Sequence, residues 1–130
     1  MQFGALFFLL LCNMAIFVKT NDPFSLVNGI KQKIREHGID TWSVDSDGDF
    51  THNVEQWRYR AWIRYRIEQE RIVFFVICRK DSNMSVTEYA VYHGRFVEML
   101  LAHFDMECKS IEVTPLATRY DKVLVYKKNG

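Results

Sequence analysis

The stretch Gln56-Trp57-Arg58-Tyr59-Arg60-Ala61-Trp62-Ile63-Arg64-Tyr65-Arg66-Ile67 decides the fold of this 130-residue chain. Side chains alternate between the two faces of a strand, and here the odd positions are apolar or aromatic while four of the even positions are arginine. The aromatic and β-branched content also favours a strand over a helix. The pattern therefore predicts one long strand over 56–67, with an apolar face and an arginine face.

A second apolar strand, Ile72 to Cys78, follows after a brief polar segment, which predicts an antiparallel hairpin. A turn at Gln69 and Glu70 fixes its register. The opposed pairs are then Tyr65 with Phe74, Ile63 with Val76, Arg64 with Phe75, and Trp62 with Ile77. One face of this hairpin is a predicted core, and the other mixes arginine with exposed apolar side chains, as interface hot spots do. The candidate partner-binding residues on that face are Arg58, Arg60, Trp62, Arg64, Arg66, Phe75 and Ile77.

Composition indicates one folded domain. The chain is 48% hydrophobic and 25% charged, which is the composition of a folded chain and not of a disordered one. Its net charge is +1, whereas nucleic-acid binders usually carry a clearly basic charge balance. The same arginine strand could stack and neutralise a nucleic-acid strand, but the charge balance favours a protein partner or a homodimer. Three widely spaced cysteines, Cys12, Cys78 and Cys108, indicate reduced thiols and no metal site.

The first twenty residues form a hydrophobic leader ahead of a single domain over 21–130. Positions 3–18 carry no charge and one strongly polar residue, Asn13. Three interpretations stay open: an uncleaved membrane anchor, a secretory signal and a buried core helix. The anchor is favoured, because no basic residue precedes the apolar run. Since Lys19 and the next positive charges follow the run, the domain of an inner-membrane anchor would be cytoplasmic. The alternative is export after cleavage.

The rest of the chain predicts two helices and further strands. Asp22 and Pro23 begin a helix whose apolar stripe is Phe24, Val27, Ile30 and Ile34, and Gly38 ends it in the left-handed conformation. Ser85 and Glu88 form a capping box. The stripe of the helix that they begin is Tyr89, His93, Phe96, Val97, Leu100, Leu101 and Phe104. Strands are expected at 39–44, 50–53, 110–114 and 122–126, with Asp47-Gly48 as a hairpin turn.

These elements predict an α+β domain: an antiparallel β-sheet with helices packed on one face, in the order α-β-β-β-β-α-β-β, preceded by a hydrophobic N-terminal helix. The acids at 45, 47 and 49 begin like a calcium loop, but Phe50 and Gln56 stand where the loop needs glycine and glutamate. We therefore expect a turn and no metal there.

No residue set identifies a reaction. A pairing of Cys78 with His93 or His103 is conceivable, but Cys78 lies in an apolar strand and His93 on a packing stripe. The four histidines lack the spacing of a zinc site. We expect no enzyme activity and no cofactor or small-molecule substrate.

The helix ending at Gly38, the Asp-Ser-Asp-Gly-Asp-Phe turn at 45–50, the aromatic strand followed by Ile72 to Cys78, and the capped helix together resemble the YbjN-like group. That group shares its fold with type III secretion chaperones. The resemblance covers about residues 24–114 and implies an α+β module that binds another protein, often as a dimer. The function we expect is a chaperone-like or adaptor protein. The alternatives are an immunity protein that neutralises a toxin and a small thiol or histidine enzyme.

Overall fold

The computed structural model describes residues 15–79, 85–114 and 122–128. The described elements are, in chain order, β1 (Ile16–Lys19), α2 (Pro23–Arg35), β2 (Trp42–Val44), β3 (Phe50–His52), β4 (Ala61–Glu68), β5 (Arg71–Arg79), α3 (Val86–His103), the 3₁₀ turn η1 (Asp105–Glu107), β6 (Ser110–Val113) and β7 (Lys122–Lys128). The predicted α+β class is confirmed.

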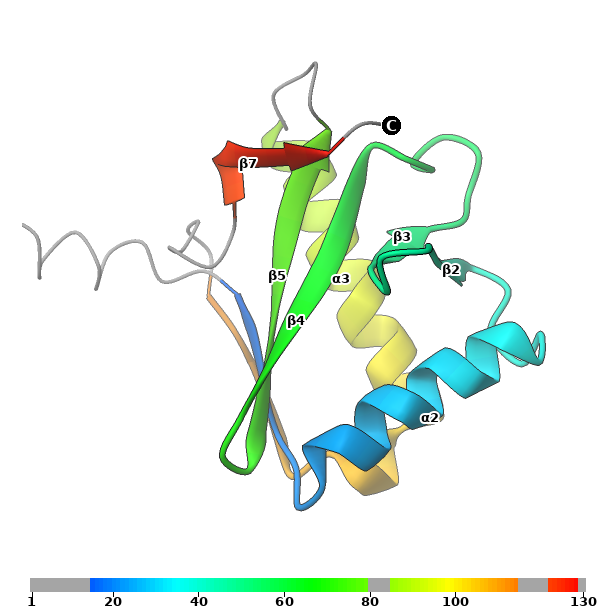
Figure 1. Cartoon of the computed structure of the whole chain (residues 1–130), viewed down its shortest axis with the longest axis vertical. Helices are drawn as coiled ribbons and strands as arrows, with labels where there is room; N and C mark the ends of the chain where they lie inside the picture. The colour runs from blue at the N-terminus through cyan, green and yellow to red at the C-terminus, as the bar shows by residue number, and fades with distance from the viewer. Residues whose placement is uncertain (1–14, 80–84, 115–121, 129–130) are drawn as a thin grey trace, which may run out of the picture.

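The sheet runs in the order β2-β3-β4-β5-β1-β6, and every neighbouring pair in it is antiparallel (Figure 1). β7 lies off this path and pairs in parallel with the end of β5. Both helices pack on one face, where α2 and α3 contribute to the same buried cluster as the inward side chains of the strands. Phe74 lies at the centre of that cluster, 4.7 Å from Phe96 and 6.5 Å from Phe50 between ring centroids.

Strand β1 changes the interpretation of the N-terminal segment. Ile16–Lys19 pairs with β5 on one side and with β6 on the other, and Ala15, Ile16 and Val18 are fully buried. The predicted leader over 1–20 therefore overlaps an inner strand of the sheet, in which three β-forming residues, Ile16, Phe17 and Val18, pair with a strand on each side. Residues 1–14, including Cys12, lie outside the described part of the chain. Within the described residues, no helix is both long and apolar enough to cross a membrane.

Helix α2 begins as its sequence predicts and ends differently. Asp22 is the N-cap, with its Oδ1 accepting from Ser25 N at 3.1 Å, and Pro23 takes the first turn. The left-handed residue at the end is His37 (φ 63°), not Gly38. Gly38 is needed for space instead, since its N–H donates to Lys33 O at 2.8 Å and an added Cβ would lie 2.8 Å from the Lys33 side chain. Phe24 was predicted to be buried but is 66% exposed.

Helix α3 carries the predicted capping box: Ser85 Oγ accepts from Glu88 N at 3.1 Å, and Glu88 Oε1 accepts from Ser85 N at 2.9 Å. Its buried stripe differs from the prediction in part. His93, Phe96, Leu100 and the following Phe104 are buried as expected, but Leu101 is exposed, and Tyr92 and Met99 are buried although the prediction left them out. The predicted stripe was therefore rotated slightly toward solvent.

The β4–β5 hairpin has the predicted register in all four pairs. Tyr65 lies opposite Phe74, Ile63 opposite Val76, Arg64 opposite Phe75, and Trp62 opposite Ile77. Glu70 takes φ 57° in the two-residue turn after Glu68. The hairpin is the part of the sheet that sequence alternation predicted correctly.

Candidate interaction site

The first half of the predicted arginine strand is a compact turn over 53–60. Val54 O accepts from both Trp57 N and Arg58 N at 2.8 Å, and Trp57 O accepts from Arg60 N at 3.2 Å. These bonds coil the backbone, so β4 begins only at Ala61. Arg58 and Arg60 therefore do not share a sheet face with Arg64 and Arg66, and the prediction of one strand over 56–67 was wrong at its start.

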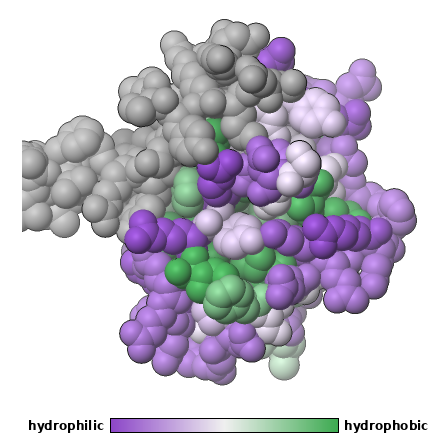
Figure 2. Space-filling model, in the orientation of Figure 1, coloured by the Kyte–Doolittle hydropathy of each residue, from purple (hydrophilic) through white to green (hydrophobic). Residues whose placement is uncertain are grey.

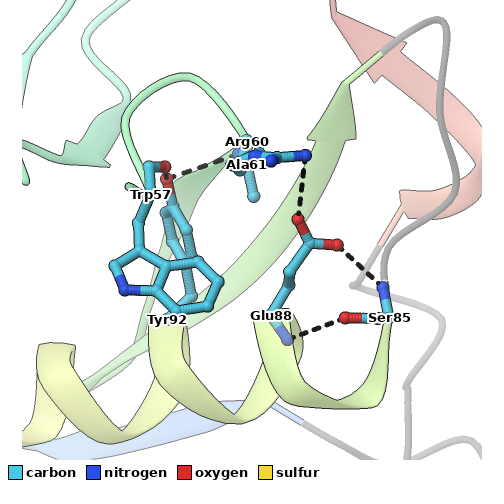
Figure 3. A network of polar contacts seen from close by, with 6 residues as sticks. All are labelled: Trp57, Arg60, Ala61, Ser85, Glu88 and Tyr92. Carbon is cyan, nitrogen blue, oxygen red and sulfur yellow. Dashed lines mark hydrogen bonds and ion pairs between the residues drawn. The ribbon is translucent and has the colours of Figure 1, made fainter. Parts of the chain in front are cut away.

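Tyr92 holds this turn against helix α3 (Figure 3). Its side chain is fully buried, and its hydroxyl donates to Trp57 O and accepts from Ala61 N at 3.4 Å. The same hydroxyl lies 3.2 Å from Thr51 Oγ1. Burial raises the pKa of Tyr92, so the hydroxyl keeps its proton and remains a donor to the turn.

Thr51 completes the anchorage from β3. Its Oγ1 donates to Ala61 O at 2.9 Å and accepts from Tyr59 N at 3.3 Å. One buried hydroxyl on a strand and one on a helix thus bind the second half of the turn, at Trp57 and Tyr59, and the first residue of β4, Ala61. Buried polar groups that are satisfied in this way specify one backbone conformation.

Arg60 and Glu88 make a second connection between the turn and α3. Arg60 Nη1 lies 3.5 Å from Glu88 Oε2, while the other carboxylate oxygen of Glu88 accepts from Ser85 N (Figure 3). Glu88 is only 17% exposed, whereas the side chain of Arg60 is 54% exposed. The residue that caps the helix therefore also positions an arginine of the turn.

The end of the turn presents three side chains to solvent, those of Arg58, Tyr59 and Arg60. Tyr59 has φ 60° and is 49% exposed, and its ring centroid lies 6.5 Å from that of Trp62. The neighbouring Arg58 is also exposed. A bulky residue with positive φ is strained, and such strain persists only where the surrounding contacts impose it. Here those contacts are the hydrogen bonds to Tyr92 and Thr51.

The predicted binding face of the sheet is largely closed. Trp62 is 2% exposed, Phe75 8% and Ile77 0%, so these three candidate residues are buried. Phe75 and Ile77 belong to a second buried cluster with Ala15, Phe17 and Val73. Figure 2 shows hydrophobic residues in the middle of the face turned to the viewer, bordered by hydrophilic ones. Because Trp62, Phe75 and Ile77 are buried, the exposed tryptophan and aliphatic side chains expected on this face are not found at these three positions.

The two remaining arginines of β4 differ from each other. Arg64 forms a two-bond ion pair with the buried Asp49, through Nε to Oδ1 at 3.0 Å and Nη2 to Oδ2 at 2.9 Å. Arg66 is 66% exposed and lies 3.8 Å from Glu68. The structure thus assigns Arg64 to holding the β2–β3 hairpin, and Arg66 to the surface away from the turn.

The acidic turn has the predicted hairpin form. Gly48 takes φ 86°, Gly48 N donates to Asp45 O, and Asp45 Oδ1 accepts from the backbone N of Asp47 and Asp49. The carboxylates of Asp45, Asp47 and Asp49 lie within 4.8 Å of one another. Asp45 stabilises the turn and Asp49 pairs with Arg64.

Of the three groups considered for catalysis, Cys78 and His93 lie in the interior, and His103 is partly exposed. Cys78 is 1% exposed and His93 4% exposed. His93 stacks on Tyr89 with 4.2 Å between ring centroids, its Nδ1 lies 2.9 Å from Tyr89 O, and burial lowers the pKa of its imidazole to about 4. Burial next to Glu107 and Asp105 raises the pKa of the Cys108 thiol to about 11, so this thiol stays protonated near neutral pH.

Sequence reasoning missed two residues of the turn site. Tyr59 was placed on the buried face of a strand, and Tyr92 was left off the helix stripe. The signal for Tyr92 was present, because Tyr92, Phe96 and Met99 recur at four and three positions, the spacing of one helix face. No local pattern marks Tyr59, whose conformation depends on contacts from β3 and α3.

Comparison of the chain with protein-family models, with curated proteins and with solved structures finds no match.

Proposed function

We propose that this protein is a non-enzymatic binding module, an adaptor or chaperone-like protein, that contacts a protein partner through the turn over 53–60. One observation carries the proposal: an exposed tyrosine is held in a strained conformation by buried hydroxyls of two other elements. Strain of this kind is costly to keep, and proteins concentrate it at functional positions.

The chemistry of the turn suits protein recognition. Tyrosine and arginine are the side chains most enriched at interface hot spots, and Tyr59 stands between Arg58 and Arg60. Because Tyr92 and Thr51 already order the turn, a partner would lose little of its binding free energy to ordering it. Of the seven residues predicted from sequence, the proposal keeps Arg58 and Arg60 and gives the buried Trp62, Phe75 and Ile77 a structural role.

The resemblance to YbjN-like proteins and type III secretion chaperones points in the same direction, since those folds hold other proteins. The proposal includes membrane attachment, but only through residues before Ala15. Ala15 is buried, and Ile16 to Val18 pair with β5, so these residues belong to the folded domain.

Site-specific photo-crosslinking in the cells that express the protein tests the proposal. A photoreactive amino acid replaces Tyr59 in one version and Glu98 in a matched control, since Glu98 is an exposed residue of α3 with a 70% exposed side chain. We expect an adduct of defined mass from position 59 only, and its loss when Arg58→Glu is added. Equal adducts from both positions, or adducts that Arg58→Glu leaves unchanged, would contradict the turn as the binding surface.

A further inference from the structure

In the described part of the chain, strand β6 has a neighbouring strand on one side only. It is the last strand in the path and pairs with β1 alone. Thr114 N donates to Ala15 O. Every second residue pair of an antiparallel ladder is hydrogen-bonded, so Phe17–Glu112 and Lys19–Ser110 are the hydrogen-bonded pairs between β1 and β6. The N–H and C=O groups of Ile111 and Val113 therefore point away from β1. Among the described residues, none pairs with them.

The side chains of β6 fall on two different faces. Ile111 and Val113 lie opposite Val18 and Ile16 on the face of the main core, where Ile111 stays half-buried and Val113 is 45% exposed. Ser110 and Glu112 are exposed on the opposite face. Proteins often guard an open edge with lysine or proline. Here Lys109 and Pro115 flank the strand, but neither residue type occupies position 111 or 113, whose backbone N–H groups point away from β1.

We propose that β6 pairs antiparallel with β6 of a second copy of this chain, with Ile111 opposite Ile111 of the second copy. In this register Ser110 lies opposite Glu112 of the second copy, twice, so polar side chains meet on one face. On the other face the two half-buried isoleucines meet and join the cores. On the same face Val113 lies opposite Lys109 of the second copy, twice, where the lysine methylene groups cover the valine. The strand thus pairs with a copy of itself without placing like charges directly opposite each other, which is the observation that favours a second copy over an unrelated peptide.

The sequence also selects between registers. A shift of two residues would place Glu112 directly opposite Glu112 of the second copy, and like charges directly opposite each other are destabilising. A shift of two residues further along the strand would bring Pro115, which has no N–H, opposite Ile111. The isoleucine-centred register avoids both penalties. This edge is separate from the turn over 53–60, so the inference does not depend on the proposed function.

Sedimentation velocity of the full chain over a range of concentrations tests the pairing, with two variants at the exposed position 110. Ser110→Glu sets two pairs of carboxylates against each other and should raise the dimer dissociation constant about tenfold, whereas Ser110→Lys should lower it. Because Ser110 is exposed, neither change removes a core contact. In the wild type, the Ile111 amide should exchange its hydrogen more slowly as the concentration rises, with no such change at Glu112, whose amide already pairs with β1.

Three results would overturn the inference. One is a monomer at the highest soluble concentration. Another is a dimer whose dissociation constant is the same in both charge variants, since that dimer uses another surface. The third is an Ile111 amide that is protected equally at all concentrations, which would mean that another segment or a bound peptide covers the edge.

Discussion

The β4–β5 hairpin and the turn over 53–60 come from the same alternating stretch of sequence, yet only the hairpin is a strand pair. In the hairpin, alternation and burial agree: Ile63, Phe74 and Val76 face the main core and are fully buried. In the turn, the same alternation continues through Arg58 and Arg60, but the backbone coils because Tyr92 and Thr51 bind it. An alternating sequence is therefore enough to form a strand where its apolar side chains become buried. Where they do not, hydrogen bonds from a few buried polar groups fold the backbone into another conformation.

The largest expected effect is on the hairpin side of this comparison. Phe74→Ala removes a fully buried ring that packs on Phe96 and Phe50, and should lower the free energy of unfolding by about 3–5 kcal/mol. Urea denaturation followed by tryptophan fluorescence measures it. Phe24→Ala, at an exposed ring, is the matched control and should change stability by less than about 0.5 kcal/mol. Similar losses from both variants would mean that Phe74 is not central to the core.

Acid should act on the helix that supports both regions. Burial lowers the pKa of His93 from 6.5 to about 4, so the unfolded chain takes up this proton first. Stability from this group is complete above about pH 6.5 and is lost as the pH falls to about 4, by about 3 kcal/mol at most.

Denaturant titrations of the wild type and of His93→Phe across that pH range measure this loss. In His93→Phe the slope of stability against pH should be smaller by about one proton at its steepest point. An unchanged slope would show that His93 is not the group that titrates on unfolding.

Tyr92→Phe should separate the turn from the hairpin. The variant keeps the ring in the core but leaves Trp57 O and Ala61 N without the hydroxyl, which should cost about 1–3 kcal/mol. Amide hydrogen exchange should accelerate over 53–60 and stay nearly unchanged in β5. Uniform acceleration throughout the sheet would mean that the turn is not a separate unit.

The smallest expected effect concerns the ion pair between the turn and α3. Arg60→Gln removes the partly exposed partner of Glu88 and keeps the capping box, so stability should fall by less than about 1 kcal/mol. Ser85→Ala, which removes the cap itself, should cost about 1 kcal/mol. Thermal unfolding of both variants compares the stability contributed by the Arg60–Glu88 ion pair with that contributed by the Ser85 cap of α3. A larger loss from Arg60→Gln than from Ser85→Ala would contradict it.

Sequence by itself determined the local parts of this protein. Asp22 with Pro23, Ser85 with Glu88, and Asp47 with Gly48 specify helix starts and a hairpin turn through bonds within a few residues, and all three are present. The hairpin register also followed from sequence, because two residues connect two apolar strands and a slip by one would turn the buried face to solvent.

Tertiary structure alone decided the rest. Ile16, Phe17 and Val18 end an apolar run whose pattern fits a membrane segment, a signal or a core helix. Only the two neighbours β5 and β6 make Ile16–Lys19 an inner strand. The closed outer face and the left-handed Tyr59 likewise depend on residues far along the chain. Local patterns record which faces are apolar and where turns occur. Packing between distant segments decides which polar groups form hydrogen bonds across the fold. In this protein the hydrogen bonds of Tyr92 and Thr51 determine the backbone conformation of the candidate binding turn.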